Sequence, residues 1–165
     1  MREQLTKHDV EKIEKEIEHR KLVVRKEAIE AVKEARAQGD LSENFEYYAA
    51  KREKNQNESR IRYLERMLRT AQIVTDDSQD DEVGLDTRVE LFYEDEGETE
   101  WIKLVTSIRG NSMEGRISIE SPLGKAILGR RAGDRVHVTV GNGGYDVVIR
   151  SIDKNGGDED EIRKF

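Results

Sequence analysis

The six residues GDLSEN, numbered 39–44, decide the fold because they separate two long stretches of helical sequence. Between Asp9 and Gln38 the chain contains no proline or glycine, and its apolar residues recur at spacings of three, four and seven, which places them on one face of a helix. This stripe consists of Val10, Ile13, Ile17, Val24, Ala28, Ala31 and Ala35. We therefore predict one helix that Asp9 or Thr6 caps at its start and that ends at Gly39.

A second helical pattern follows the turn, from Glu43 or Asn44 to about Gln72. Its inner stripe consists of Ala50, Asn57, Ile61, Leu64, Leu68 and Ala71. Two helices of similar length that are joined by a short turn fold back antiparallel. At 1.5 Å per residue the hairpin is about 45 Å long. Ser42 or Asp40 is predicted to cap the second helix.

Beyond the turn-rich acidic stretch at 76–82 the pattern changes from helix to strand. The predicted strands are 88–93, 100–108, 116–121, 135–140 and 145–152. Between the third and fourth, Ser121 as N-cap, Pro122 as first helical residue and Gly129 as terminator predict one short helix. The sequence thus predicts an α+β fold, in which an antiparallel two-helix coiled coil precedes a small, mainly antiparallel β-sheet domain with one short helix.

The predicted domains are a hairpin with an acidic tip at 1–75, a linker at 76–82, a sheet domain at 83–154 and a flexible tail at 155–165. Residues 1–75 carry a net charge of +2, whereas the remainder carries −9. A protein that binds duplex DNA by itself normally presents a strongly basic face. Any contact with nucleic acid is therefore predicted to be local or arranged by a protein partner.

The composition favours a soluble, elongated or two-part protein, because hydrophobic residues make up 35% of the chain and charged residues 39%. The absence of cysteine excludes disulfides and thiolate metal sites. No apolar run approaches the roughly 18 residues of a membrane span, and the first ten residues do not resemble a secretory signal. We expect a cytoplasmic protein with no membrane partner.

Three carboxylates mark the turn between the helices as a candidate site. Asp40 and Glu43 are three residues apart, and Glu46 follows one turn later. Carboxylates are the hard oxygen ligands that Mg²⁺ prefers, although two or three of them leave an octahedral ion incomplete. The ion would have to take its remaining ligands from water, a phosphate or a partner. Ordinary helix capping is the alternative, and spacing alone favours it.

Basic and aromatic residues follow the turn. Lys51, Arg52 and Lys54 can contact a phosphate backbone, or they can form a solvated charged face. Tyr47 and Tyr48 can stack on a base, although we expect one of them to pack between the helices. No phosphate loop, dinucleotide fingerprint or nucleophile elbow is present. The histidines show no metal-ligand spacing and are predicted to be structural; they are His8, His19 and His137.

Two separate motifs resemble the bacterial Gre transcription elongation factors, GreA more than GreB. The first is GDLSENFEYYAAK at 39–51, flanked by Ala35-Arg36 and by Glu58-Ser59-Arg60-Ile61; the second is ESPLGKAILG at 120–129. The resemblance covers nearly the whole chain and implies a coiled coil followed by an FKBP-like domain. Ser59 stands where the family usually has glycine, and residues 52–57 also depart from its pattern.

The resemblance implies that the C-terminal domain binds bacterial RNA polymerase near its secondary channel, and that the coiled coil reaches the active site. Such factors stimulate the polymerase's own endonucleolytic cleavage of backtracked nascent RNA and are not enzymes themselves. Asp40 and Glu43 would hold Mg²⁺ shared with the polymerase, with none bound tightly by the free monomer, while Glu46 would assist or only pack. The residues implied to face the RNA 3′ end are Tyr47, Lys51 and Arg52, and those implied to bind polymerase are Ser121, Pro122, Leu123, Gly124 and Lys125.

Three other functions remain open on the sequence. A Gre-like inhibitor would occupy the same channel without stimulating cleavage, although the ordinary number of tip carboxylates argues against it. A peptidyl-prolyl isomerase would need an aromatic pocket, and aromatic residues are sparse in the second half. A coiled-coil adaptor without a metal role would use Asp40 and Glu43 only as buried caps.

Overall fold

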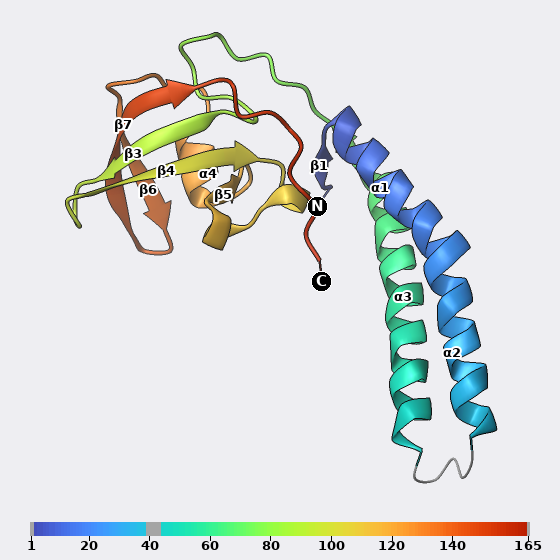
Figure 1. Cartoon of the computed structure of the whole chain (residues 1–165). Helices are drawn as coiled ribbons and strands as arrows, with labels where there is room; N and C mark the ends of the chain where they lie inside the picture. Colours follow the sequence, from blue (N-terminus) through green and yellow to red (C-terminus); the bar gives the residue numbers. More distant parts are fainter. Residues whose placement is uncertain (1, 39–43, 165) are drawn as a thin grey trace. The chain divides into compact units, whose positions relative to one another are not determined.

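The computed structural model describes residues 2–38 and 44–164, which form two compact units (Figure 1). The described residues of the first unit are 2–3, 10–38 and 44–71, and those of the second are 4–9 and 72–164. The α+β fold class predicted from the sequence is confirmed. In the described part of the chain no helix is long and apolar enough to cross a membrane.

The first unit is a helical hairpin. Its first arm comprises α1 (Lys7–His19), a π-helical turn (Arg20–Val24) and α2 (Arg25–Ala37), and its second arm is α3 (Phe45–Thr70). The arms run side by side (Figure 1). Apolar side chains between them are buried, among them Ile13, Ala35, Ile61, Leu64 and Met67. The predicted stripe is wrong at Ala31, which is exposed.

The π-helical turn interrupts what the sequence predicts as one uninterrupted α-helix. Here the backbone N–H of Arg25 donates to the carbonyl of Arg20, five residues earlier. The buried Asn57 from α3 donates its side-chain amide to the same carbonyl over 3.3 Å and accepts from the Arg20 guanidinium over 3.0 Å. A side chain from the opposite arm thus helps to satisfy the altered backbone, a contact that helical periodicity cannot reveal.

Of the two alternative caps predicted for α1, Thr6 is confirmed, because it directly precedes the helix, whereas Asp9 lies inside the first turn. The backbone N–H of Asp9 donates to Thr6 Oγ1 over 3.0 Å, and the N–H of Thr6 donates to Asp9 Oδ2 over 2.9 Å. This reciprocal pair is a capping box, which satisfies two backbone donors that a helix start would otherwise leave open.

The second unit contains a five-stranded sheet in the order β5-β4-β3-β7-β6, in which only β4 and β5 are parallel. Its strands are β3 (Arg88–Tyr93), β4 (Glu98–Val105), β5 (Arg116–Ser118), β6 (Arg135–Val140) and β7 (Gly143–Asp153). The bounds of β3 and β6 are as predicted. The predicted strand 100–108 is wrong at its end, where Ser107–Arg109 form a 3-10 turn, and the predicted strand 116–121 is too long.

The helix α4 (Pro122–Ile127) covers one face of this sheet (Figure 1). Leu123 and Ile127 project from it into a core made by the alternate inward residues of the strands. The strand residues of this core include Val89, Leu91, Ile102, Leu104, Val136, Val138, Val147 and Ile149. The predicted cap Ser121 and first residue Pro122 are confirmed, and Gly129 beyond the helix has a φ of 82°.

The second unit also holds segments that the sequence assigns elsewhere. The short strands β1 (Gln4–Leu5) and β2 (Gln72–Ile73) pair in parallel, and neither was predicted. The tail after residue 154, predicted to be flexible, makes specific contacts instead. Asp160 forms ion pairs with Lys103 at 2.6 Å and Arg109 at 3.2 Å, so the tail contributes to the packing of this unit.

Candidate functional site

Asn44 joins the two sides of the acidic turn. Its Oδ1 accepts from the backbone N–H of Tyr47 over 3.0 Å and so caps α3, while its Nδ2 donates to the carbonyl of Ala35 in α2 over 2.7 Å. The N-cap predicted at Ser42 or Asp40 is therefore wrong, because the helix begins at Phe45, one or two residues later than predicted, and Asn44 does the capping. One side chain both starts the second arm and fastens it to the end of the first.

The acidic residues themselves are placed only in part. Asp40 and Glu43, the predicted metal ligands, lie outside the described residues. Glu46 is exposed in the first turn of α3, where the positive end of the helix dipole favours a carboxylate. As a donor set, three carboxylates at this spacing fit Mg²⁺ in chemical type, and an octahedral ion would keep coordination sites free for other ligands.

Tyr47 in α3 is half-buried and contacts Arg36 in α2. The guanidinium of Arg36 donates to the Tyr47 hydroxyl over 3.2 Å, and its carbon lies 5.4 Å from the ring centroid, in cation–π geometry. The hydrogen bond from Arg36 lowers the pKa of Tyr47, as do the nearby Lys51 and Lys54. Of the two tyrosines, Tyr47 is thus the one engaged between the helices.

Two aromatic residues beside the turn face solvent. The Phe45 side chain is 84% exposed and that of Tyr48 is 48% exposed. The rings of Tyr48 and Tyr47 pack in a T-shaped arrangement, with 5.4 Å between centroids. Among the predicted RNA-facing residues, Lys51 and Arg52 are also exposed. Phe45 is not among the residues predicted from the sequence, although its place beside Tyr47 and Tyr48 in an aromatic-rich first turn was a signal available there.

The predicted polymerase-binding residues lie at α4 and its cap. The Ser121 hydroxyl accepts from the N–H of Gly124 over 3.0 Å and donates to the carbonyl of Ser118 over 2.7 Å. A side chain at Gly124 would clash with that same carbonyl, so only glycine fits there. Leu123 and Gly124 are buried, whereas Pro122 and Lys125 are exposed and Ser121 is half-buried. The surface of this motif therefore consists mainly of Pro122, Lys125 and part of Ser121.

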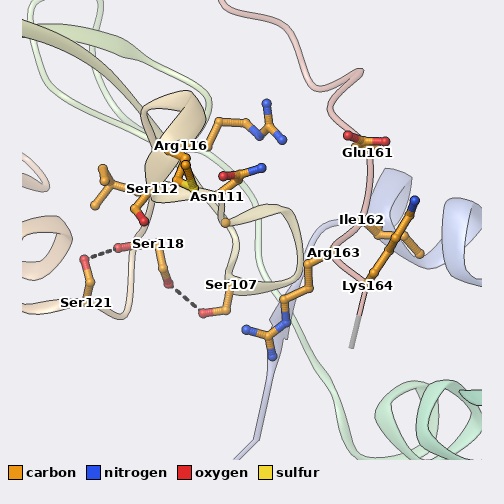
Figure 2. Close-up of a pocket in the computed structure, with 13 residues that line it drawn as sticks. Ser107, Asn111, Ser112, Arg116, Ser118, Ser121, Glu161, Ile162, Arg163 and Lys164 are labelled. Atoms are coloured by element: carbon orange, nitrogen blue, oxygen red, sulfur yellow. Dashed lines mark hydrogen bonds between the residues drawn. The ribbon is translucent and has the colours of Figure 1, made fainter.

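A cavity of about 740 Å³ lies beside Ser121 (Figure 2). One wall carries a hydrogen-bonded series of hydroxyls, in which Ser121 reaches the Ser118 carbonyl and the Ser118 and Ser107 hydroxyls lie 2.6 Å apart. The opposite wall comes from the tail and includes Arg163 and Lys164 (Figure 2). Such a lining suits polar groups of a partner, and none of the other four residues of the predicted motif reaches it.

Within the described ranges, one group of side chains has metal-ligand geometry. Atoms of His8, Asp158 and Glu159 lie within 4.8 Å of one another, and His8 Nδ1 is 2.8 Å from Asp158 Oδ2. The direct contact between the imidazole and the Asp158 carboxylate accounts for this arrangement, so we assign it no metal. Sequence spacing could not reveal it, because His8 lies about 150 residues from the tail.

Comparisons with known proteins match both halves of the chain. The family described as "Transcription elongation factor, N-terminal" matches residues 3–73, and "Transcription elongation factor, GreA/GreB, C-term" matches residues 78–154. Both descriptions define one class, the transcription elongation factors. The chain belongs to the GreA/GreB family of that class.

Individual relatives cover most of the chain. Transcription elongation factor GreA of Geobacillus kaustophilus is 46% identical over 90% of this chain and 93% of its own length. GreA of Streptococcus sanguinis is 42% identical over 91% of this chain and 94% of its own. Among solved structures, GreA factor homolog 1 of Thermus thermophilus is 30% identical and covers 92% of this chain and 99% of its own, with a TM-score of 0.43.

Proposed function

We propose that this protein binds bacterial RNA polymerase near its secondary channel and stimulates the polymerase's own endonucleolytic cleavage of backtracked nascent RNA. One observation carries the proposal. The family motif at residues 39–51 places two carboxylates in the turn between α2 and α3, on a chain that matches both GreA/GreB domains. The factor would act as a monomer in the cytoplasm and would release arrested elongation complexes.

The hairpin supplies reach and orientation. Its second arm, α3, contains 26 residues, which at 1.5 Å per residue make about 39 Å. Asn44 fastens the start of this arm to the carbonyl of Ala35 in the first arm. The second domain would bind the polymerase through the exposed Pro122 and Lys125, leaving the hairpin to enter the channel.

The acidic turn would complete a site that the polymerase provides only in part. Asp40 and Glu43 would hold Mg²⁺ together with polymerase ligands, and Glu46 would support them from the first turn of α3. The bound ion would activate water and stabilise the leaving oxygen. Because two or three carboxylates do not saturate the ion, the free protein would bind it weakly and would not be an enzyme by itself.

The test is a cleavage assay on a stalled, backtracked elongation complex. We expect Asp40→Ala with Glu43→Ala to abolish stimulated cleavage while leaving binding to polymerase intact, because the variant lacks the metal-sharing oxygens but keeps the second domain. The matched control is Asp77→Ala with Asp80→Ala, which removes the same charge from exposed positions after the hairpin. Stimulation by the tip variant equal to wild type would contradict the mechanism. If the wild-type protein slowed elongation by the polymerase uniformly and stimulated no cleavage, the result would favour the Gre-like inhibitor.

A further inference from the structure

We propose that Phe45 and Tyr48 form a stacking platform for unpaired RNA bases at the tip of the hairpin. The proposal rests on the proposed function, because it concerns the single-stranded RNA 3′ end that the tip would meet. It differs from the prediction made on the sequence, in which Tyr47 faces the RNA. Three features of the described residues support it: exposure, placement on one helix face, and adjacent positive charge.

Exposure separates the two platform residues from Tyr47. Phe45 is 84% exposed and Tyr48 is 48% exposed, so both rings are accessible to a ligand. Burying such rings against another flat surface gives a large hydrophobic gain and a preferred ring geometry. The half-buried Tyr47, in contrast, has the Arg36 guanidinium carbon over one face of its ring at 5.4 Å and accepts a hydrogen bond from it at its hydroxyl. Tyr47 is therefore engaged by Arg36 on the other arm and packs against Tyr48 in a T-shaped arrangement.

The platform residues share one face of α3. Phe45 and Tyr48 are three residues apart, which makes them neighbours on a helix surface. Ala49, four residues after Phe45, is exposed on the same face and is too small to cover the rings. The first turn of α3 thus presents an open aromatic surface directly after the acidic turn.

Positive charge continues along the same face. Arg52 lies four residues after Tyr48 and seven after Phe45, and Lys51 lies three after Tyr48; both side chains are exposed. Aromatic rings followed by cations match the requirements of a single strand, whose bases stack and whose phosphates are anionic. A partner helix would instead need an apolar stripe along this face, which Arg52 ends. We therefore infer single-stranded RNA as the occupant.

The experiment places 2-aminopurine, whose fluorescence falls on stacking, at the RNA 3′ end of a backtracked elongation complex. It is carried out with the Asp40→Ala and Glu43→Ala variant, so that the RNA stays intact. We expect this protein to quench the fluorescence, and further substitution of Phe45→Ala with Tyr48→Ala to remove the quenching. In the cleavage-competent background, the same two substitutions should raise the half-saturating factor concentration roughly tenfold, because stacking on each ring is lost. Phe45→Trp in place of Phe45→Ala should restore both the fluorescence quenching and the half-saturating factor concentration.

The matched control is Leu22→Ala, which removes a 66% exposed apolar side chain from the same hairpin away from the tip. It should change neither signal. Unchanged quenching and unchanged half-saturation in the Phe45 and Tyr48 variant would overturn the platform, even if wild type stimulates cleavage normally. A wild-type protein that quenches the fluorescence but stimulates no cleavage would overturn the proposed function and leave the platform standing.

Discussion

Asn44 is the side chain on which the geometry of the candidate tip depends. Its amide has one acceptor and one donor end, and the structure uses each on a different arm of the hairpin. Serine, threonine or aspartate could cap α3 equally well, but none of them presents an amide donor to the carbonyl of Ala35 at the same time. Asparagine therefore does two things at once: it caps α3 locally and it links the two arms of the hairpin.

We predict that Asn44→Ala opens the first turn of α3. Loss of a cap costs about 1 kcal/mol, so the backbone N–H of Tyr47 should exchange with solvent roughly fivefold faster. Amide hydrogen exchange measured by NMR checks this. Asn44→Asp is the informative companion, because a carboxylate keeps the cap but cannot donate to Ala35. It should protect the Tyr47 amide nearly as well as wild type and still reduce stimulated cleavage. Unchanged exchange in the alanine variant would show that the cap contributes little.

At the scale of the elements, a polar layer crosses the middle of the helical hairpin. Glu16 accepts from Arg20 over 2.7 Å and from the buried Arg60 over 2.9 Å, while Asn57 bonds to Arg20 from the opposite arm. Such a layer contributes less to stability than an apolar one of equal size would, but breaking one partner leaves a buried charge uncompensated. It is satisfied only when the two arms are in the observed register.

We predict that Glu16→Gln destabilises the hairpin by about 2 kcal/mol, because it removes the charge that compensates Arg60. Denaturant unfolding followed by the helical circular dichroism signal measures the effect. Glu65→Gln is the control. It breaks a pair with Lys21 at 3.4 Å whose side chains are more than 40% exposed, and it should cost less than about 0.5 kcal/mol. Equal effects of the two substitutions would refute a special role for the layer.

The same carboxylate predicts a pH dependence. Burial raises the pKa of Glu16, but hydrogen bonds and charge from Arg60 and Arg20 outweigh it, and the pKa lies below its ordinary value of 4.5. A lowered folded-state pKa means that this stabilisation is complete above pH 4.5 and is lost as the pH falls through the folded-state value. The stability difference between wild type and Glu16→Gln should therefore shrink on acidification. A difference that stays constant down to the acid transition would contradict the assignment.

At the scale of the whole molecule, a buried arginine gathers distant parts of the chain into the second unit. Arg109 is fully buried and donates to Asp9 in the first turn of α1, to Asp86 and to Asp160 from the tail. Burial raises the pKa of Asp86, although Arg109 opposes this rise. Both ends of the described chain thus contribute charge to one interior site.

We predict that Asp160→Asn lowers the stability of the second unit by about 1 to 3 kcal/mol, because Arg109 and the nearly buried Lys103 lose a shared anion. Thermal unfolding followed by near-ultraviolet signals of Trp101 on β4 reports this. Glu159→Gln, one residue earlier and exposed, is the control and should be neutral. An Asp160 variant as stable as its control would mean that the tail is dispensable.

The sequence by itself determined the hairpin, the bounds of β3 and β6, and the Ser121–Pro122 start of α4. These features depend on periodicity and capping, which are set by residues within a few positions of one another. The family motif likewise singled out the acidic turn without any tertiary information. Its assignment to metal sharing stays a prediction, since Asp40 and Glu43 lie outside the described residues.

Only the tertiary structure decided which aromatic residue beside the turn is free and which is engaged. Tyr47 and Tyr48 are equivalent in sequence, and it is Arg36 on the other arm that covers one of them. The parallel pairing of β1 with β2 and the ion pairs of Asp160 are likewise decided by the tertiary structure. In each case the deciding contact joins residues on different elements, and most of these residues lie far apart in the chain. Local pattern carries no information about such contacts, because burial and packing are properties of the folded chain.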